Sequence, residues 1–430
     1  MKKLTILIPN SRPPYVKGTE TVQIKNIMSH VNEKIQTKLV WVIFQPSKIN
    51  NYEKFDGEII NFDDYCDAIE IVDKIKPDII LNETEFFTQS VAFGLAAKFR
   101  NIPLVTYCLV SYVKTSLLFN IRSKLRILFS NDVFLQTTDS NESMLKFNQR
   151  KLKFIEKTLK KMGYNKMKII YFLIHFILKQ FFAFSYVPVS KLIEGDLNLC
   201  SNIKWADYLI KNDFKKSSIV VTGDPYLDTL FLNSKNSDKI KNKPGITKIL
   251  FCTSPMHEHG YVSKKEENDV ILKTIDKIIQ NKNFEITLKI HPSTSSKTEY
   301  EKMLDKREIK IYQKEDLMDI LPQFNVMITY GASSVIPYAI ILKKPIVFLD
   351  MFSYTKNLNL FYDELVAVRC DQISELEQKI YQSMKKEINE IHYKKYIEKH
   401  LGMFDGKSSA RSCESILKFL DNFSHKNKIE

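Results

Sequence analysis

Apolar stretches of strand length alternate with amphipathic stretches of helix length near the amino-terminal end of the chain. The apolar runs at residues 4–9, 39–44, 78–81 and 104–108 predict strands. Between them, residues 21–31, 64–76 and 88–100 have helical spacing, and Pro77 ends the second of these helices. Strands that alternate with helices are typical of a parallel sheet covered by helices. The sequence therefore predicts an α/β domain here.

The same alternation returns in the second half of the chain. We expect strands at 219–222, 248–253, 284–290, 309–312, 326–329 and 345–349, and helices at 264–280, 316–323 and 333–342, with Asp316 as the cap of the second helix. The fold class is therefore α/β, with two Rossmann-like domains that face each other across a cleft. We expect a first domain at 1–222, a polar linker at 223–247, and a second domain with carboxy-terminal helices at 248–430.

Residues 111–215 interrupt the alternation and predict a helical, basic insertion in the first domain. Within it, residues 169–184 are apolar except for His175, Lys179 and Gln180, with several lysines upstream. Three interpretations remain open: a buried helix, a helix that lies on an anionic membrane surface through residues 168–184, or a membrane span. The stretch is shorter than the about 20 residues that a spanning helix needs.

Composition narrows the class of protein. A chain of 430 residues is long enough for two domains, and 44% hydrophobic with 27% charged residues is normal for a globular protein. Six widely spaced cysteines without a CxxC pair, and the lack of a signal-peptide pattern, favour a cytoplasmic protein, free or peripheral on the inner face of the membrane. The net charge of +14 is spread along the chain without an aromatic platform, so we expect no nucleic-acid partner.

The strand at 326–329 leads into a segment with the chemistry of a phosphate cradle. Thr329 ends the strand, and Gly331, Ser333 and Ser334 follow at the predicted start of a helix. Backbone N–H groups and hydroxyls at a helix amino terminus bind anions, so these residues are candidates for donor binding. The alternative is an ordinary serine cap.

Two further strand ends in the second half carry polar residues. Lys289 and His291 end the strand at 284–290, and His291 is a candidate catalytic residue that contacts a phosphate or protonates a leaving group. Thr253, Ser254 and His257 follow the strand at 248–253 and are candidate donor-binding residues. The two histidines of this loop lack a third ligand at a suitable spacing, so we expect no metal and no cofactor.

The first half offers carboxylates and a polar loop at the corresponding strand ends. Glu83 and Glu85 follow the strand at 78–81 and are candidate general bases for an acceptor hydroxyl. Gly18 and Thr19 belong to the loop after the first strand and are candidate acceptor-side residues. Surface carboxylates that only contact water are the alternative for both glutamates.

Three segments resemble CDP-glycerol glycerophosphotransferases and related capsule and surface-polysaccharide transferases. The stretch ITYGASSVIPYAIILKKPIVFLD ending at Asp350 is similar to their ITDYSS turn, helix, KKP turn and strand. The His291-Pro292 pair is similar to their HP motif, and DGKSSAR at residues 405–411 to their DGxAxxR ending. The aspartate of the ITDYSS turn has no counterpart here, which places the glycerol-phosphate substrate in doubt more than the fold.

This resemblance implies a metal-independent GT-B transferase of polysaccharide biosynthesis. Ser333 and Ser334 would contact the donor phosphates and His291 would lie beside the leaving group. The donor would be a nucleotide sugar or CDP-polyol, and the acceptor a hydroxyl of a glycan or lipid-linked molecule. The absence of an acidic residue between Ser333 and Ile341 favours an inverting reaction.

Non-hydrolysing UDP-N-acetylglucosamine 2-epimerases are a second resemblance. They have a similar strand end where Thr253 and Ser254 stand, and a similar strand followed by His-Pro. Their acidic GGxQEE helix start is replaced here by residues 331–337, GASSVIP, and this substitution favours transfer over epimerisation. A GT-B scaffold without catalysis, which docks to a membrane or partner, is a third hypothesis.

Overall fold

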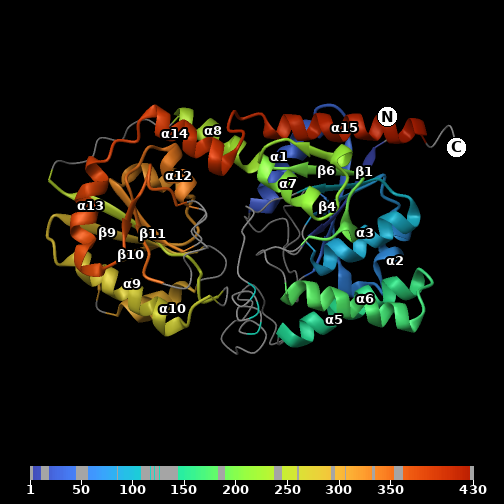
Figure 1. Cartoon of the computed structure of the whole chain (residues 1–430), viewed down its shortest axis with the longest axis horizontal. Helices are drawn as coiled ribbons and strands as arrows, with labels where there is room; N and C mark the ends of the chain where they lie inside the picture. Colours follow the sequence, from blue (N-terminus) through green and yellow to red (C-terminus); the bar gives the residue numbers. More distant parts are fainter. Residues whose placement is uncertain are drawn as a thin grey trace. The chain divides into compact units, whose positions relative to one another are not determined.

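The computed structural model describes residues 3–10, 19–44, 57–84, 86–107, 144–182, 189–236, 245–258, 261–291, 296–305, 307–331, 335–352 and 362–426, with the single residues 117, 121 and 125. The chain divides into two compact units. The first unit contains residues 1–120, 138–228 and 402–430, and the second contains residues 121–137 and 229–401. Each unit is an α/β domain around its own parallel sheet (Figure 1).

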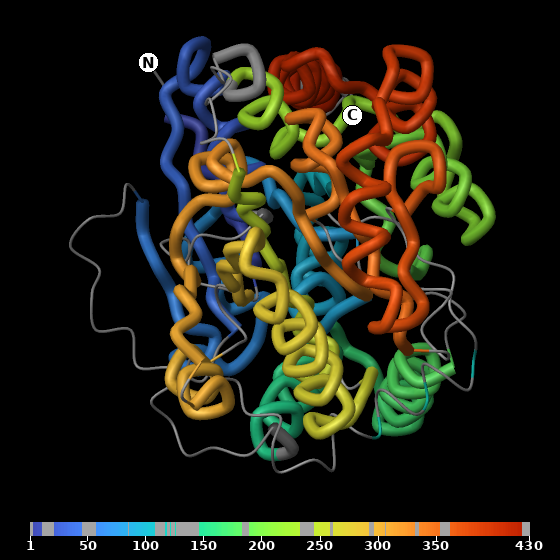
Figure 2. Tube along the Cα trace, turned by 90° about the vertical axis from the view of Figure 1, so that its left-hand side faces the viewer, coloured from blue at the N-terminus to red at the C-terminus, as the bar shows by residue number. Residues whose placement is uncertain are grey.

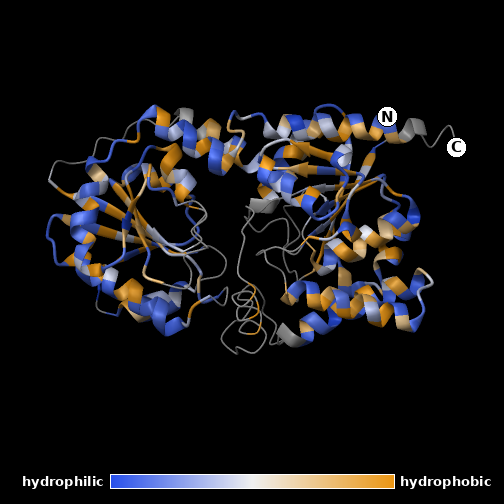
Figure 3. Ribbon diagram, viewed as in Figure 1, coloured by the Kyte–Doolittle hydropathy of each residue, from blue (hydrophilic) through white to orange (hydrophobic). Residues whose placement is uncertain are grey.

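The sheet of the first unit has seven parallel strands in the order β3-β2-β1-β4-β5-β6-β7. Its strands are β1 (Leu4–Asn10), β2 (Thr37–Ile43), β3 (Glu58–Asn61), β4 (Ile79–Glu83), β5 (Leu104–Tyr107), β6 (Leu197–Cys200) and β7 (Ile219–Val221). The middle strands are buried and almost wholly hydrophobic (Figure 3), as strands covered on both faces must be.

Helices cover both faces of this sheet. They are α1 (Thr19–Asn32), α2 (Ala68–Ile75), α3 (Thr88–Arg100), α5 (Met144–Lys161), α6 (Lys166–Phe181), α7 (Ile203–Lys211) and α15 (Ser408–Lys426), with short 3₁₀ turns η1 (Phe62–Asp64), η2 (Lys191–Ile193) and η3 (Lys216–Ser218). On one face α15 packs against α1; on the other, α3 packs against α5, and α5 against α6. Helices α5 and α6 thus lie at the end of the unit away from α15 (Figures 1 and 2).

The sheet of the second unit has six parallel strands in the order β10-β9-β8-β11-β12-β13. They are β8 (Thr247–Cys252), β9 (Phe284–Lys289), β10 (Lys310–Tyr312), β11 (Val326–Tyr330), β12 (Ile346–Leu349) and β13 (Val368–Cys370). The helices are α9 (Lys264–Ile279), α10 (Lys297–Leu304), α11 (Leu317–Ile320), α12 (Ile336–Ile341), α13 (Leu376–Lys385) and α14 (Glu390–Tyr396), with η4 (Leu321–Gln323), η6 (Ile373–Glu375) and the π-helical turn η7 (Ile397–Leu401).

The prediction of two α/β domains, each with a parallel sheet, is confirmed. Three segments lie differently from the predicted boundaries. Helix α8 (Pro225–Asn236) occupies much of the predicted linker. The predicted insertion contains β6 and α7, because the apolar residues of β6 add a strand to the first sheet. Residues 402–430 belong to the first unit, because Cys413 and Ile416 of α15 are buried in the same hydrophobic cluster as Ile24 and Met28 of α1. The predicted cap of α11 is confirmed: the Asp316 side chain accepts a hydrogen bond from Met318 N.

Candidate functional site

The second unit has a topological switch point between β8 and β11, where the strand order reverses. Ligands of doubly wound sheets bind beyond the carboxyl ends of the strands at such a point. Here the loop at residues 253–258 follows β8, and Gly331 follows β11. The two strand ends are joined by Ser254, whose Oγ donates a hydrogen bond of 2.8 Å to the carbonyl oxygen of Tyr330. Predicted residues from two segments therefore meet at one sheet edge.

Glu267, in the first turns of α9, holds this edge together. Its Oε1 accepts a hydrogen bond of 2.7 Å from Tyr330 Oη, and its Oε2 accepts one of 2.8 Å from the backbone N–H of His257. Oε1 also accepts a hydrogen bond of 3.3 Å from Met256 N. Burial, followed by the negative charge of Glu258, raises the pKa of Glu267 to about 8, although the three donors oppose this rise. The carboxyl group is therefore largely protonated at neutral pH.

Gly331, directly after β11, lies close to the loop that follows β8. Its φ of +67° lies in the left-handed region, which a residue with a Cβ adopts only with strain. A Cβ placed on Gly331 would lie 2.5 Å from Sδ of the buried Met256. Glycine is thus required both by the backbone conformation and by the packing of the loop after β8.

The remaining predicted residues of the second unit lie around this edge but differ in exposure. Thr253 and His257 are buried, and His257 Nδ1 lies 3.4 Å from the carbonyl oxygen of Val262. Thr329 is completely buried in β11. His291 follows β9 and is half-buried.

The side chain of Lys289 binds backbone carbonyl groups. Its Nζ donates hydrogen bonds of 2.8 Å to the carbonyl oxygen of Gln313 and 3.2 Å to that of Ile290. Burial lowers the pKa of its ammonium group. This ammonium therefore ties β9 to the segment after β10, and we do not include Lys289 among the residues offered to a ligand.

The first unit has its own switch point, between β1 and β4. Asn10 ends β1, Glu83 ends β4 and Tyr107 ends β5, and all three side chains are buried. Glu83 Oε2 accepts a hydrogen bond of 3.2 Å from Gln89 Nε2. The neighbouring Thr84 is completely buried, and its hydroxyl has no hydrogen-bond partner in the described part of the chain. Buried polar groups of this kind gain free energy when a ligand or water meets them.

Four predicted site residues, Gly18, Glu85, Ser333 and Ser334, lie outside the described residues. Thr19 is the first residue of α1, and its side chain is not described. Among the described residues, no three histidine, cysteine, aspartate or glutamate side chains are grouped so that they could hold a metal ion.

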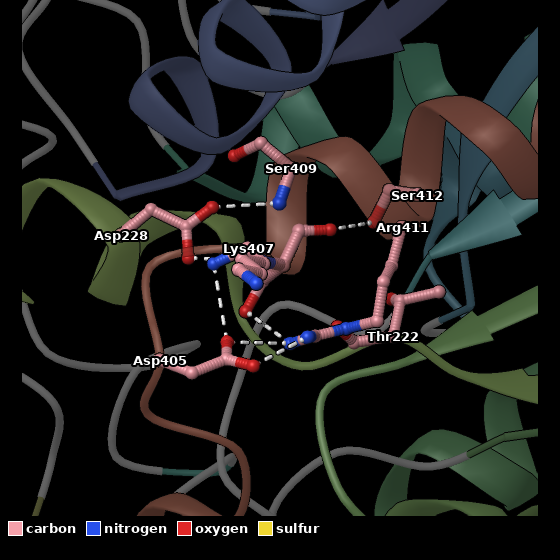
Figure 4. A network of polar contacts seen from close by, with 8 residues as sticks. Thr222, Asp228, Asp405, Lys407, Ser409, Arg411 and Ser412 are labelled. Carbon is pink, nitrogen blue, oxygen red and sulfur yellow. Dashed lines mark hydrogen bonds and ion pairs between the residues drawn. The ribbon is translucent and has the colours of Figure 1, made fainter.

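The predicted DGxxxxR segment docks α15 onto the first unit. Arg411 forms two hydrogen bonds to Asp405, of 2.7 and 3.0 Å, and its Nε donates one of 2.8 Å to the carbonyl oxygen of Thr222 (Figure 4). The hydrogen bonds to Arg411 lower the pKa of Asp405. Because Arg411 binds both Asp405 and the backbone after β7, it holds the start of α15 in place.

Asp228 of α8 completes this docking. Its two carboxylate oxygens accept hydrogen bonds from the backbone N–H groups of Ser408, at 3.0 Å, and Ser409, at 2.6 Å (Figure 4). These N–H groups lie at the amino terminus of α15, where a negative charge is stabilising. Gly223, with φ of +89°, allows the close approach, since a Cβ there would lie 2.4 Å from Ser408 Oγ. The motif therefore has a structural role.

Sequence reasoning missed Glu267 and Tyr330. The sequence did contain a signal for the first: Ser263 and Glu266 form a capping box at the start of α9, which places Glu267 one position further along, towards the sheet. Nothing in the spacing indicates that Tyr330 turns its hydroxyl towards Glu267.

Comparisons with known proteins give one family and a set of similar folds. Residues 194–417 match the model of the family described as UDP-N-acetylglucosamine 2-epimerase. No curated protein sequence matches the chain.

Among solved structures, the S. aureus MnaA–UDP complex is similar with a TM-score of 0.51 and 14% identity, over 97% of both chains. The Methanocaldococcus jannaschii UDP-GlcNAc 2-epimerase in complex with UDP-GlcNAc and UDP gives 0.53 and 14%, over 97% of this chain and 100% of that one. The wall teichoic acid polymerase TagF gives 0.51 and 11%, over 99% and 89%. At these identities the likeness concerns the fold, two Rossmann-like domains of GT-B type.

Proposed function

Because this chain belongs to the UDP-N-acetylglucosamine 2-epimerase family, we propose that it binds a UDP-linked N-acetylhexosamine and inverts the configuration at C2 of the sugar. One observation carries the proposal. The residues that match the family, 194–417, include the whole sheet of the second unit and therefore its switch point. The sequence-based preference for transfer is thereby replaced, and epimerisation, its alternative, becomes the leading function.

The chemistry defines what the site must contain. Inversion at C2 requires that a proton leaves C2 and that a proton returns from the opposite face, so a base and an acid are needed. His291, half-buried at the end of β9, and His257, in the loop after β8, are our candidates for this work. Glu267 acts through this loop and is a positioning residue, since it holds the His257 backbone.

The nucleotide is assigned to the carboxyl edge of β8 and β11. Gly331, at the end of β11, has a left-handed backbone conformation, and its lack of a Cβ leaves room for the Met256 side chain. Ser333 and Ser334 follow in the sequence and remain the proposed diphosphate ligands.

The test is incubation of the protein with UDP-N-acetylglucosamine alone, in deuterated water, followed by proton NMR. We expect a second UDP-sugar with deuterium at C2, because the proton that returns comes from solvent. A His291→Ala variant that still binds UDP but forms no product would assign proton transfer to this side chain. If the substrate remains unchanged and keeps its C2 proton, epimerisation is excluded.

Group transfer is the second candidate, and two observations favour it. Residues 331–341 contain no acidic side chain, and TagF, a polymerase, shares the fold. In this case Glu83 or Glu85 would deprotonate an acceptor hydroxyl and His291 would stabilise the departing phosphate. The same NMR sample separates the two functions, because a transferase consumes the donor only after an acceptor is added. A binding screen with UDP and CDP adds the base preference: bound ligand at a hundredfold excess over Kd raises stability by about 2.7 kcal/mol.

A further inference from the structure

Helix α6 of the first unit exposes an unusual amount of apolar surface. Eight of the 21 exposed large hydrophobic residues in the described part of the chain fall between residues 164 and 182. Met167 and Tyr171 are each 74% exposed, and Ile174 is 51% exposed. Single exposed apolar residues are common, but a contiguous group on one helix indicates a binding surface.

The exposed residues form one stripe along the helix. Met167, Tyr171, Ile174 and Leu178 follow one another at spacings of three or four residues, so they lie on the same face. The opposite face is the buried one: Phe176 is buried, and its ring centre lies 5.1 Å from that of Phe86. Helix α6 is therefore already packed on its unit, and the stripe is additional apolar surface.

Positive charge surrounds this stripe. Residues 144–182 contain nine lysines and one arginine but a single carboxylate, Glu156. Lys166 and Lys168 are exposed in the first turn of α6, and Lys160 is exposed at the end of the neighbouring α5. The adjacent Lys161 is also exposed, but its ammonium lies 3.7 Å from a carboxylate oxygen of Asp67. The long aliphatic stems of lysines let the ammonium groups reach past an apolar surface towards anions.

We propose that the α6 stripe, with its lysines, is a docking surface for the anionic face of a lipid bilayer. Helix α6 would lie in the plane of the interface, with Tyr171 and Ile174 among the acyl chains and the lysines at the phosphates. No helix in the described ranges is long and apolar enough to cross a membrane. A second copy of the chain fits less well, because the same basic residues would repel each other. The inference is independent of the reaction proposed above.

The first experiment is flotation of the whole protein with vesicles of phosphatidylcholine alone or mixed with phosphatidylglycerol. We expect flotation with the mixed vesicles and its loss at high salt, because surface charges are screened. Equal flotation with both vesicle types, or none with either, overturns the proposal.

Polar substitutions in the stripe test whether membrane binding depends on this surface and not on other exposed apolar residues. A Tyr171→Ser, Ile174→Ser, Leu178→Ser variant is expected to lose more than about tenfold in vesicle affinity, since these side chains would no longer enter the apolar layer. The matched control is Ile203→Ser with Ile391→Ser, at positions 69% and 64% exposed on other helices. Circular dichroism checks that both variants are folded. Equal loss in the control contradicts a specific stripe.

Removal of lysine charges tests the electrostatic part of the proposed membrane binding. Lys166→Gln and Lys168→Gln are each expected to reduce affinity for the mixed vesicles about fivefold. Lys277→Gln, on α9 of the second unit, is the control. Undiminished affinity without Lys166 and Lys168 contradicts the proposed role of these lysines.

A fluorescent reporter tests the geometry directly. Both native tryptophans, Trp41 and Trp205, are fully buried, so their emission stays constant when a membrane binds. A Tyr171→Trp variant is expected to shift its emission to the blue with mixed vesicles. Flotation without a shift assigns binding to another surface. A dimer in sedimentation that the triple-serine variant dissociates, with vesicle binding unchanged, assigns the stripe to a second copy instead.

Discussion

The switch points of the two sheets are built from similar strands, yet the polar side chains at these points differ in their hydrogen bonds. In the second unit, Ser254, Tyr330 and Glu267 bind one another and the loop after β8, so the edge is fixed by its own side chains. In the first unit, Thr84 and Ser90 are completely buried, and their hydroxyls have no hydrogen-bond partner in the part of the chain that is described. The second unit has one such hydroxyl at its switch point, that of Thr329 in β11, beside the hydrogen-bonded network.

The two edges therefore differ in what their polar groups can do. The network of the second unit is already oriented by its own hydrogen bonds, whereas the hydroxyls of the first unit can still form one. A carboxyl that already accepts three hydrogen bonds orients the loop but has little capacity left for a substrate. A buried hydroxyl without a partner costs free energy in the free protein and regains it when a ligand supplies the missing contact. We therefore expect substitutions in the hydrogen-bonded network of the second switch point to change stability most, and substitution of a buried hydroxyl at the first to change ligand binding more than stability.

The largest effect is expected at Gly331. In a Gly331→Ala variant, the positive φ costs about 1–2 kcal/mol and the displacement of Met256 a similar amount, so unfolding free energy should fall by about 3 kcal/mol. Urea unfolding measures the change. Gly245→Ala is the control, because its φ is +99° but a Cβ there has no atom within 4 Å; it should lose about 1 kcal/mol. Equal losses would show that packing against Met256 contributes nothing.

The second effect concerns pH. The pKa of Glu267 is about 8 in the folded chain against an ordinary value of 4.5, so the folded chain holds the proton more strongly. The stability that this gives is complete below pH 4.5 and is lost as pH rises through 8, with a slope of at most about 1.4 kcal/mol per pH unit.

A Glu267→Gln variant should remove this slope. It should also lose about 2 kcal/mol at pH 5, because the amide presents N–H groups to donors that faced oxygen. Urea unfolding of both proteins at several pH values gives the difference between them, which should shrink as pH rises from 5 and reverse its sign before pH 8. A constant difference would mean that Glu267 does not change its protonation in this range.

A smaller effect is expected for Tyr330→Phe. The ring keeps its packing against Phe251 and Phe352, but Glu267 loses one of its donors. The variant should unfold about 1 kcal/mol more easily, and its loss of stability with rising pH should continue to higher pH, because the hydrogen bond from Tyr330 lowers the pKa of Glu267. Urea unfolding at several pH values measures where the loss ends, and an unchanged profile contradicts the coupling.

The smallest effect on stability is expected at Thr84, and it would sharpen the comparison most. Thr84→Val replaces a hydroxyl without a partner by a methyl group and should change stability by less than about 1 kcal/mol. Thr158→Val is the matched control, since Thr158 is equally buried but its hydroxyl accepts from Ala68 N and donates to the Phe154 carbonyl oxygen; it should lose about 2 kcal/mol. Calorimetric titration with UDP-N-acetylglucosamine should show weaker binding only for Thr84→Val.

The sequence predicts the sheets far better than the side-chain network. The runs at 4–9 and 326–329 became β1 and β11 because buried parallel strands are continuously apolar. The four residues of β3, at the edge of the sheet, have no such run and were missed. Gly331 was selected as part of a predicted phosphate cradle, because it stands between the end of an apolar strand and two serines. Glu267 was missed because its burial depends on the tertiary packing of α9, which no local pattern encodes.

The return of α15 to the first unit affects how the protein is synthesised. Residues 408–426 leave the ribosome only after the entire second unit, yet Cys413 and Ile416 belong to the hydrophobic cluster of the first. Until then the apolar face of α1 lacks its cover, and the nascent first unit exposes surface on which chaperones act or aggregation begins. The second unit, which needs no later segment for its sheet, can fold before the first is finished.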